Sequence, residues 1–124
     1  ALAEVVAGRI DIKDSIYFET AKAVIKSESF ELLDQVATIM KDHDEITMLR
    51  VEGHTDSRGN AGYNLRLSKE RAAAVRQYLV DKGVSADRLV SEGFGESKPI
   101  DPANNAAAWT KNRRVDFFIA ERAD

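Results

Sequence analysis

The sequence has no cysteine among its 124 residues. This absence excludes disulfides, zinc–thiolate sites, iron–sulfur clusters and cysteine nucleophiles. It is compatible with a reducing compartment and equally with a disulfide-free periplasmic protein. The chain also lacks any apolar run approaching the ~20 residues of a membrane-spanning helix. It begins without Met or a leader pattern, so we expect a processed chain or a domain of a longer protein.

The sequence also has no excess of positively charged residues. Lys and Arg number 18 and Asp and Glu number 21, so the formal net charge is −3. Binding to nucleic acid or to an anionic lipid surface usually depends on a concentration of Lys and Arg. We therefore expect no nucleic-acid partner, and membrane association only through a part of the protein outside these residues.

Length and composition predict a single globular domain. Hydrophobic residues make up 44% of the chain and charged residues 31%, which is typical of folded soluble domains. We expect the domain to span residues 10–120, with residues 1–9 as a lead-in and residues 121–124 as a tail.

The spacing of apolar residues predicts strands alternating with helices. Alternation predicts strands at 10–18, with a break near 13–14, and at 113–120. A mostly apolar run predicts a strand at 46–52 that is covered on much of both faces, and a further strand is expected at 88–94. Helical spacing predicts helices at about 27–42 and 62–82 and a short one at 104–109. The order β-α-β-α-β-(α)-β predicts an α/β (α+β sandwich) fold, with a mixed four-stranded sheet covered by helices.

The long helix has an unusual stripe. Asn64, Ser68, Arg71, Val75 and Leu79 lie along one side at helical spacing. The apolar half must face the sheet, but the other half of the same stripe is polar. Buried polar groups need partners, and local sequence rules tend to fail at functional sites.

A cleft is expected at this polar end. The helix follows a polar, glycine-bounded loop that leaves a strand, and ligands of α/β sheets bind beyond strand ends. Thr55 and Asp56 on the loop should therefore surround one cleft together with Asn64, Ser68 and Arg71.

The charges of this cleft suit a zwitterion. An Asp carboxylate accepts hydrogen bonds from an ammonium, and an Arg guanidinium holds a carboxylate with two hydrogen bonds. The alternative is structural, with an Asp56–Arg71 salt bridge and Asn64 as the helix cap. Spacing alone leaves both interpretations open.

A series of ordered motifs covers the chain from about residue 10 to residue 119. The motifs are Ile16-Tyr17-Phe18, Val51-Glu52-Gly53-His54-Thr55-Asp56, Tyr63-Asn64-Leu65, Leu67-Ser68, Arg71-Ala72, Gly93-Phe94-Gly95 and Asn112-Arg113-Arg114-Val115. Together they resemble the OmpA-like C-terminal peptidoglycan-binding domain family, of the outer membrane protein A and peptidoglycan-associated lipoprotein type.

The resemblance implies a function. It implies non-covalent binding of peptidoglycan through the meso-diaminopimelate of the stem peptide, which would anchor an outer-membrane or envelope protein to the cell wall. The expected location is the periplasm of a Gram-negative-type bacterium.

The resemblance also implies roles for residues. It assigns Asp56 to the ammonium of diaminopimelate and Arg71 to its carboxylate, with Asn64 and Arg113 as further pocket positions. The stretch 19–21 would line the cleft through its backbone. The family often has Asp or Asn there, and this chain has Glu and Ala.

Catalytic signals are missing. The sequence has no Gly-x-Ser-x-Gly and no Ser-x-x-Lys at the cleft. His43 and His54 lie on different predicted elements, so we expect no metal and no cofactor.

The alternatives are a peptidoglycan-processing enzyme using the same cleft and a protein–protein scaffold domain. The candidate ligand-binding residues are Asp56, Arg71, Asn64, Thr55, Ser68 and Arg113.

Overall fold

The computed structural model describes residues 1–123. In chain order the strands and α-helices are β1 (Ala3–Val6), β2 (Arg9–Ile12), α1 (Phe30–Asp42), β3 (Ile46–His54), α2 (Ala61–Asp81), β4 (Leu89–Gly95), α3 (Ala106–Asn112) and β5 (Arg114–Arg122). Short 3₁₀ turns precede α1 at Ser27–Ser29 and β4 at Ala86–Arg88. No helix in this range is long and apolar enough to cross a bilayer.

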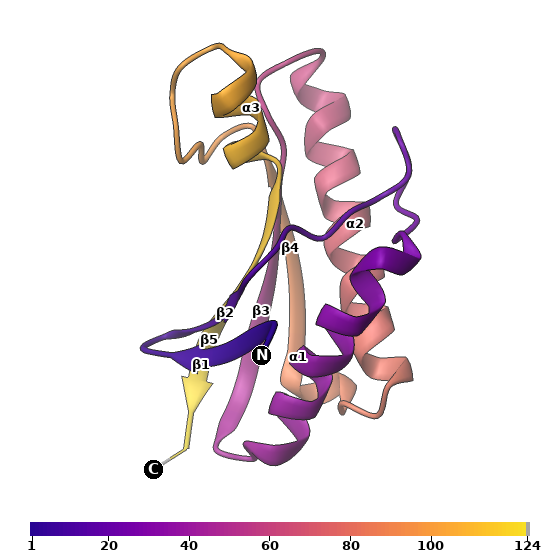
Figure 1. Ribbon diagram of the computed structural model, residues 1–124, viewed down its shortest axis with the longest axis vertical. Helices are drawn as coiled ribbons and strands as arrows, with labels where there is room; N and C mark the ends of the chain where they lie inside the picture. The colour runs from indigo at the N-terminus through magenta and orange to yellow at the C-terminus, as the bar shows by residue number, and fades with distance from the viewer. Residues whose placement is uncertain (124) are drawn as a thin grey trace.

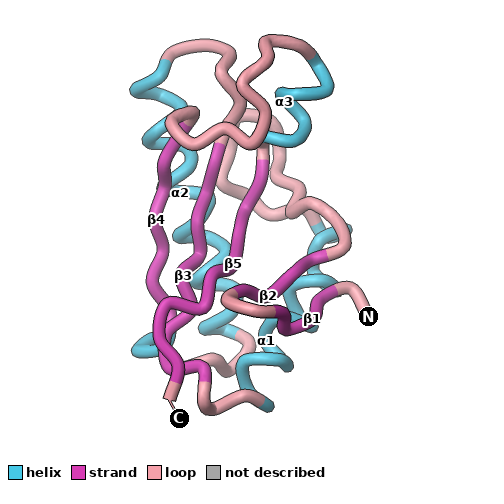
Figure 2. The backbone as a smooth tube through the Cα atoms, turned by 90° about the vertical axis from the view of Figure 1, so that its left-hand side faces the viewer, coloured by secondary structure: helices cyan, strands magenta, loops and turns pink. Residues whose placement is uncertain are grey.

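The strands form one mixed sheet in the order β1-β2-β5-β3-β4. β3 and β4 are parallel, and the other neighbours are antiparallel. Helices α1 and α2 cover one face of the sheet (Figure 1), and Figure 2 looks onto the opposite face with the helices behind the strands. The predicted α/β class and mixed sheet are confirmed, but the sheet has five strands rather than four.

The extra strand is β1, in the segment expected to be a lead-in. It forms a hairpin with β2 across a turn in which Gly8 has a φ of 77°. Ala3 is buried, and the backbone N–H of Leu2 donates to Oε1 of Gln35 at 2.6 Å. Four residues are too few to show a clear alternation. At the other end β5 runs to Arg122, and residue 124 of the expected tail lies outside the described residues.

The predicted first strand, 10–18, is wrong in its second half. Only its beginning belongs to β2, and residues 13–26 cross the molecule towards α2 (Figure 1); we call this segment the strap. Phe18 and Ile25 form one isolated bridge within it, and Ile16 is buried in the core. The alternation of apolar residues here reflects burial of the strap and not strand pairing.

The other predicted elements are confirmed with shifts of a few residues at their ends. The core lies between the helices and the inward side of the sheet, and Val75 and Leu79 are fully buried as predicted. Burying such side chains stabilises the fold by ~1.5–3 kcal/mol each. Other fully buried core residues are Leu33, Val36, Met40, Leu49, Val51 and Phe117.

Two glycines let α2 approach the strands closely. A Cβ on Gly53 would collide with the backbone oxygen of Ser68, and one on Gly93 with the backbone nitrogen of Lys69. Glycine in a strand commonly marks such a close approach of two backbones. The contact holds the polar half of α2 against the ends of β3 and β4.

Candidate functional site

A cavity of about 430 Å³ opens beside these strand ends. Its walls come from the strap, the end of β3, the polar half of α2, and the chain around the α3–β5 junction. Among residues 1–123, three arginines line it, Arg71, Arg113 and Arg114, and no Asp or Glu does. The apolar part of the wall includes Ile16, Phe18 and Val115. The cavity is thus both cationic and partly apolar.

Arg71 is half-buried at the junction of α2 and the strap. Its Nε donates to the carbonyl of Lys22 at 2.9 Å, and its Nη2 lies 3.4 Å from the carbonyl of Glu19. Its Cζ lies 4.8 Å from the centre of the Phe18 ring, within cation–π range. Burial lowers the pKa of Arg71 below its ordinary value. Among residues 1–123 no carboxylate lies within ion-pair distance of it, so its charge suits an anionic ligand group.

Asp56 is buried, is not among the residues that line the cavity, and has partners within the protein. Its Oδ1 accepts from the backbone N–H of Arg58 at 2.8 Å and from Nε at 3.2 Å, and its Oδ2 accepts from Nη2 at 2.8 Å. Burial would raise the pKa of Asp56, but the hydrogen bonds and charge of Arg58 outweigh burial and hold the pKa below its ordinary value. The Asp56–Arg71 salt bridge of the structural alternative does not form; Asp56 pairs with Arg58.

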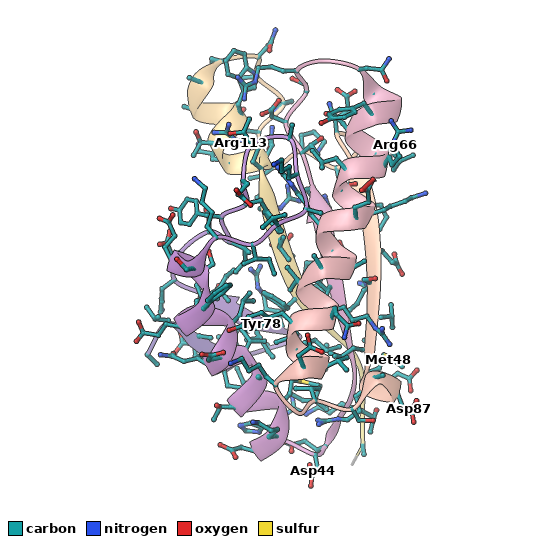
Figure 3. The ribbon with its side chains drawn as sticks, turned by 90° about the vertical axis from the view of Figure 1, so that its right-hand side faces the viewer. Asp44, Met48, Arg66, Tyr78, Asp87 and Arg113 are labelled. Carbon is teal, nitrogen blue, oxygen red and sulfur yellow. The ribbon has the colours of Figure 1, made fainter. Side chains whose placement is uncertain are left out.

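Arg113 lines the cavity and also approaches Asp56. Its Nε is 3.7 Å from Oδ2 of Asp56, and its Nη2 is 3.3 Å from Oγ1 of Thr110. Half of its side chain is exposed. The structure therefore brings Arg71 and Arg113 (the latter labelled in Figure 3) to one cavity, and Asp56 lies within ion-pair distance of Arg113.

Asn64 and Thr55 are buried but lie outside the cavity wall. Asn64 donates from Nδ2 to the carbonyl of Arg58 at 2.8 Å, and Thr55 donates from Oγ1 to the carbonyl of Asp56 at 3.0 Å. Both side chains hold the loop that carries Asp56. The cap of α2 is Asn60 and not Asn64.

Ser68 lines the cavity and has hydrogen-bond partners of its own. Its Oγ donates to the carbonyl of Leu65 and accepts from the backbone N–H of Gly95, at 2.8 and 2.9 Å. This link joins α2 to the end of β4. Asn64 and Ser68 of the predicted polar stripe are therefore buried as expected and are satisfied by the protein itself, whereas Arg71 is half-buried.

Arg58, Phe18 and Arg114 were not predicted as site residues. The contact between Asp56 and Arg58 could have been predicted from their spacing, because an Asp side chain readily accepts a hydrogen bond from the backbone N–H two residues further along the chain. Arg114 is paired with Asp116 at 2.9 Å. In the strap, residues 20 and 21 line the cavity, as the resemblance implied for this stretch.

His54 is a buried residue at the end of β3. Its Nε2 lies 3.3 Å from Oε1 of Glu52, and its ring stacks on Phe94. Burial lowers the pKa of His54, which favours the neutral ring at pH 7. His43 pairs with Glu45 elsewhere. Across residues 1–123 no group of three or more His, Asp or Glu side chains comes together as a metal site would require.

Comparisons with known proteins agree on one family. Residues 17–113 match the OmpA family. Outer membrane protein A of Bordetella avium is 39% identical over 113 residues, covering 91% of this chain and 58% of that protein. The peptidoglycan-associated lipoprotein of Mesorhizobium japonicum is 35% identical over 106 residues, covering 86% of this chain and 62% of that protein. The chain thus spans about six tenths of the length of these curated relatives.

A solved structure shares the fold. The crystal structure of the peptidoglycan-associated lipoprotein from Burkholderia pseudomallei superposes with a TM-score of 0.76 at 34% identity, covering 86% of this chain and 89% of that one. The sequence match and the structural match each span most of the chain. The chain belongs to the OmpA family.

Proposed function

We propose that this domain binds peptidoglycan non-covalently through the meso-diaminopimelate of the stem peptide. In doing so it would anchor an outer-membrane or envelope protein to the cell wall, in the periplasm of a Gram-negative-type bacterium. The observation that carries the proposal is Arg71, a half-buried guanidinium without a carboxylate partner among the described residues, at the wall of a cavity whose Arg113 lies within ion-pair distance of Asp56. The names of the relatives supply the ligand class.

Diaminopimelate matches the chemistry of this cavity. Its free end bears an ammonium and a carboxylate on one carbon, joined by a methylene chain to the rest of the peptide. The carboxylate would bind Arg71, with Arg113 close enough to share it, and the ammonium would bind Asp56. The methylene chain would lie against the apolar wall that includes Phe18 and Val115.

The domain would act by binding alone. Hydrolysis of glycan commonly uses two carboxyl groups across a sugar, and no Asp or Glu of the part of the chain that the structure describes lines the cavity. Membership of the OmpA family supports a non-enzymatic role. Incubation with purified sacculi separates the alternatives, because an enzyme would release soluble muropeptides and an anchoring domain would not.

The test is binding to sacculi by Asp56→Ala and Arg71→Ala. Removing one partner of a desolvated, hydrogen-bonded ion pair costs about 2–5 kcal/mol, and this open cavity favours the lower end. Each variant should therefore bind at least roughly tenfold more weakly while its melting curve shows a folded protein. Arg66→Ala is the matched control, since Arg66 lies on α2 away from Arg113 (Figure 3). Unchanged binding by both site variants would rule out this site and favour a scaffold domain.

A further inference from the structure

Asp56 already has a cation where the proposed ligand would place its ammonium. Three hydrogen bonds from Arg58 cover both carboxylate oxygens, two from the guanidinium and one from the backbone N–H. Nε of Arg113 lies 3.7 Å from Oδ2. One buried carboxylate is therefore faced by two guanidiniums.

The net charge around Asp56 disfavours the binding of a third cation. Asp56, Arg58 and Arg113 together carry a net charge of +1. A ligand ammonium brought against this group would meet net repulsion in a partly desolvated site, where charges interact more strongly than in water. A favourable contact therefore requires one guanidinium to leave the carboxylate.

We infer that Arg58 is an internal competitor for the ammonium site, whose guanidinium leaves Asp56 when the ligand binds. The inference rests on the proposed function and adds a regulation of its affinity. The ammonium can bind only those molecules in which the Arg58 guanidinium has left Asp56. The apparent affinity of the domain for its ligand is therefore reduced in proportion to the fraction of such molecules.

The surroundings of Arg58 allow this exchange. Its side chain is 48% exposed, so the released guanidinium can be hydrated. Its Cζ also lies 4.4 Å from the centre of the Trp109 ring, a cation–π contact that does not involve Asp56. The hydrogen bond from the backbone N–H of Arg58 to Oδ1 does not depend on the side chain. Asp56 would therefore keep its position after the guanidinium has moved.

The test is calorimetric titration of the domain with a soluble stem peptide that contains meso-diaminopimelate. Arg58→Ala should bind the peptide about twofold to fivefold more tightly than the unmodified protein, the range expected for removal of one competing, half-exposed ion pair. Arg58→Lys keeps the charge but loses the two-point contact, and its affinity should fall between the two. Arg66→Ala removes the same charge outside the site and should leave the affinity unchanged.

Long-range electrostatics alone predicts the opposite effect of Arg58→Ala on affinity. The stem peptide carries carboxylates, so loss of a nearby positive charge would by itself weaken binding. Equal or weaker binding by Arg58→Ala would overturn the inference and make Arg58 a ligand contact or a support for Asp56. The proposed function fails separately, if the unmodified protein does not bind the peptide or if Asp56→Ala and Arg71→Ala bind it as well as the unmodified protein does.

Discussion

Asp56 and Arg71 differ in the partners that the protein provides for their charges. Asp56 is neutralised by a neighbouring arginine, whereas Arg71 is held by carbonyl oxygens of the strap and by the Phe18 ring. A dipole and an aromatic face leave most of a guanidinium charge uncompensated. A ligand carboxylate should therefore gain more electrostatic attraction from Arg71 than a ligand ammonium gains from Asp56, as long as Arg58 remains paired with Asp56.

The titration of Asp56 should report its pairing with Arg58. The pKa of Asp56 in the folded protein is lowered, so the pair stabilises the fold above the unfolded value of about 3.9. This stabilisation is lost as the pH falls through the lower, folded pKa. We expect the ¹³C shift of the Asp56 carboxyl to titrate with a midpoint below 3.9.

Arg58→Ala provides the internal comparison for this titration. Removing the guanidinium removes the largest influence that lowers the pKa of Asp56. Burial still raises this pKa, and only the backbone N–H of residue 58 and the charge of Arg113 still lower it. The midpoint should therefore move upward in the variant. A midpoint that is the same in both proteins would mean that the pair does not persist in solution.

The burial of the polar stripe could be predicted from sequence, and its partners could not. Helical spacing places Asn64 and Ser68 on the side of α2 that faces the sheet, and both are buried. Their partners are a loop carbonyl and the N–H of Gly95, which is 27 residues from Ser68. Those contacts depend on the path of the loop and on the position of β4, which local patterns do not contain.

At the scale of elements, the position of α2 depends on the absence of side chains beneath it. Gly93→Ala should push α2 away from β4, because the new Cβ would overlap the backbone of Lys69. We expect the free energy of unfolding to fall by about 1–3 kcal/mol, as for other overpacked sites, and binding of sacculi to weaken as Arg71 is displaced. Chemical denaturation measures the first effect and a pull-down the second.

Gly62→Ala is the control for this substitution. A Cβ at Gly62 would contact only the side-chain oxygen of Asn60, at 3.2 Å, and alanine favours helix. Its stability should change by less than about 1 kcal/mol. Equal effects of the two substitutions would contradict the close approach of α2 to β4.

Leu79→Ala separates the core half of α2 from the site half. Leu79 is fully buried at the apolar end of the helix. Its truncation should lower the free energy of unfolding by about 2–5 kcal/mol, while the protein that remains folded still binds sacculi. An unchanged melting temperature with loss of binding would mean that the helix faces the sheet differently.

Long, regular elements were predictable, and short ones were not. α1, α2 and the strands β3, β4 and β5 are each seven residues long or longer, and each lies close to its predicted range. β1 has four residues, too few to show a clear alternation. The strap alternates like a strand because Ile16 and Phe18 turn towards the protein interior, although the segment pairs with no neighbouring strand of the sheet.

At the scale of the whole molecule, the cavity joins segments that are far apart in the chain. The strap, the end of β3, the polar half of α2 and the α3–β5 junction all contribute to its wall. The resemblance to the OmpA-like family implied that Asp56, Arg71 and Arg113 share one pocket. The structure has Arg71 and Arg113 in the cavity wall, and Asp56 lies 3.7 Å from Arg113 without lining the cavity itself. Composition and periodicity alone could not place Arg113, because its approach to Asp56 depends on how β5 pairs with β3.

The most direct test of the account is competition between two soluble stem peptides, one with meso-diaminopimelate and one with lysine. Lysine keeps the side-chain ammonium and lacks the carboxylate beside it, so Arg71 would be left unpaired in a partly desolvated cavity. Such a loss costs about 1–3 kcal/mol, and the lysine peptide should compete roughly ten- to a hundredfold more weakly. The preference should disappear in Arg71→Ala. Equal competition by the two peptides in the protein with Arg71 intact would show that Arg71 does not bind the ligand's carboxylate, and would contradict the account.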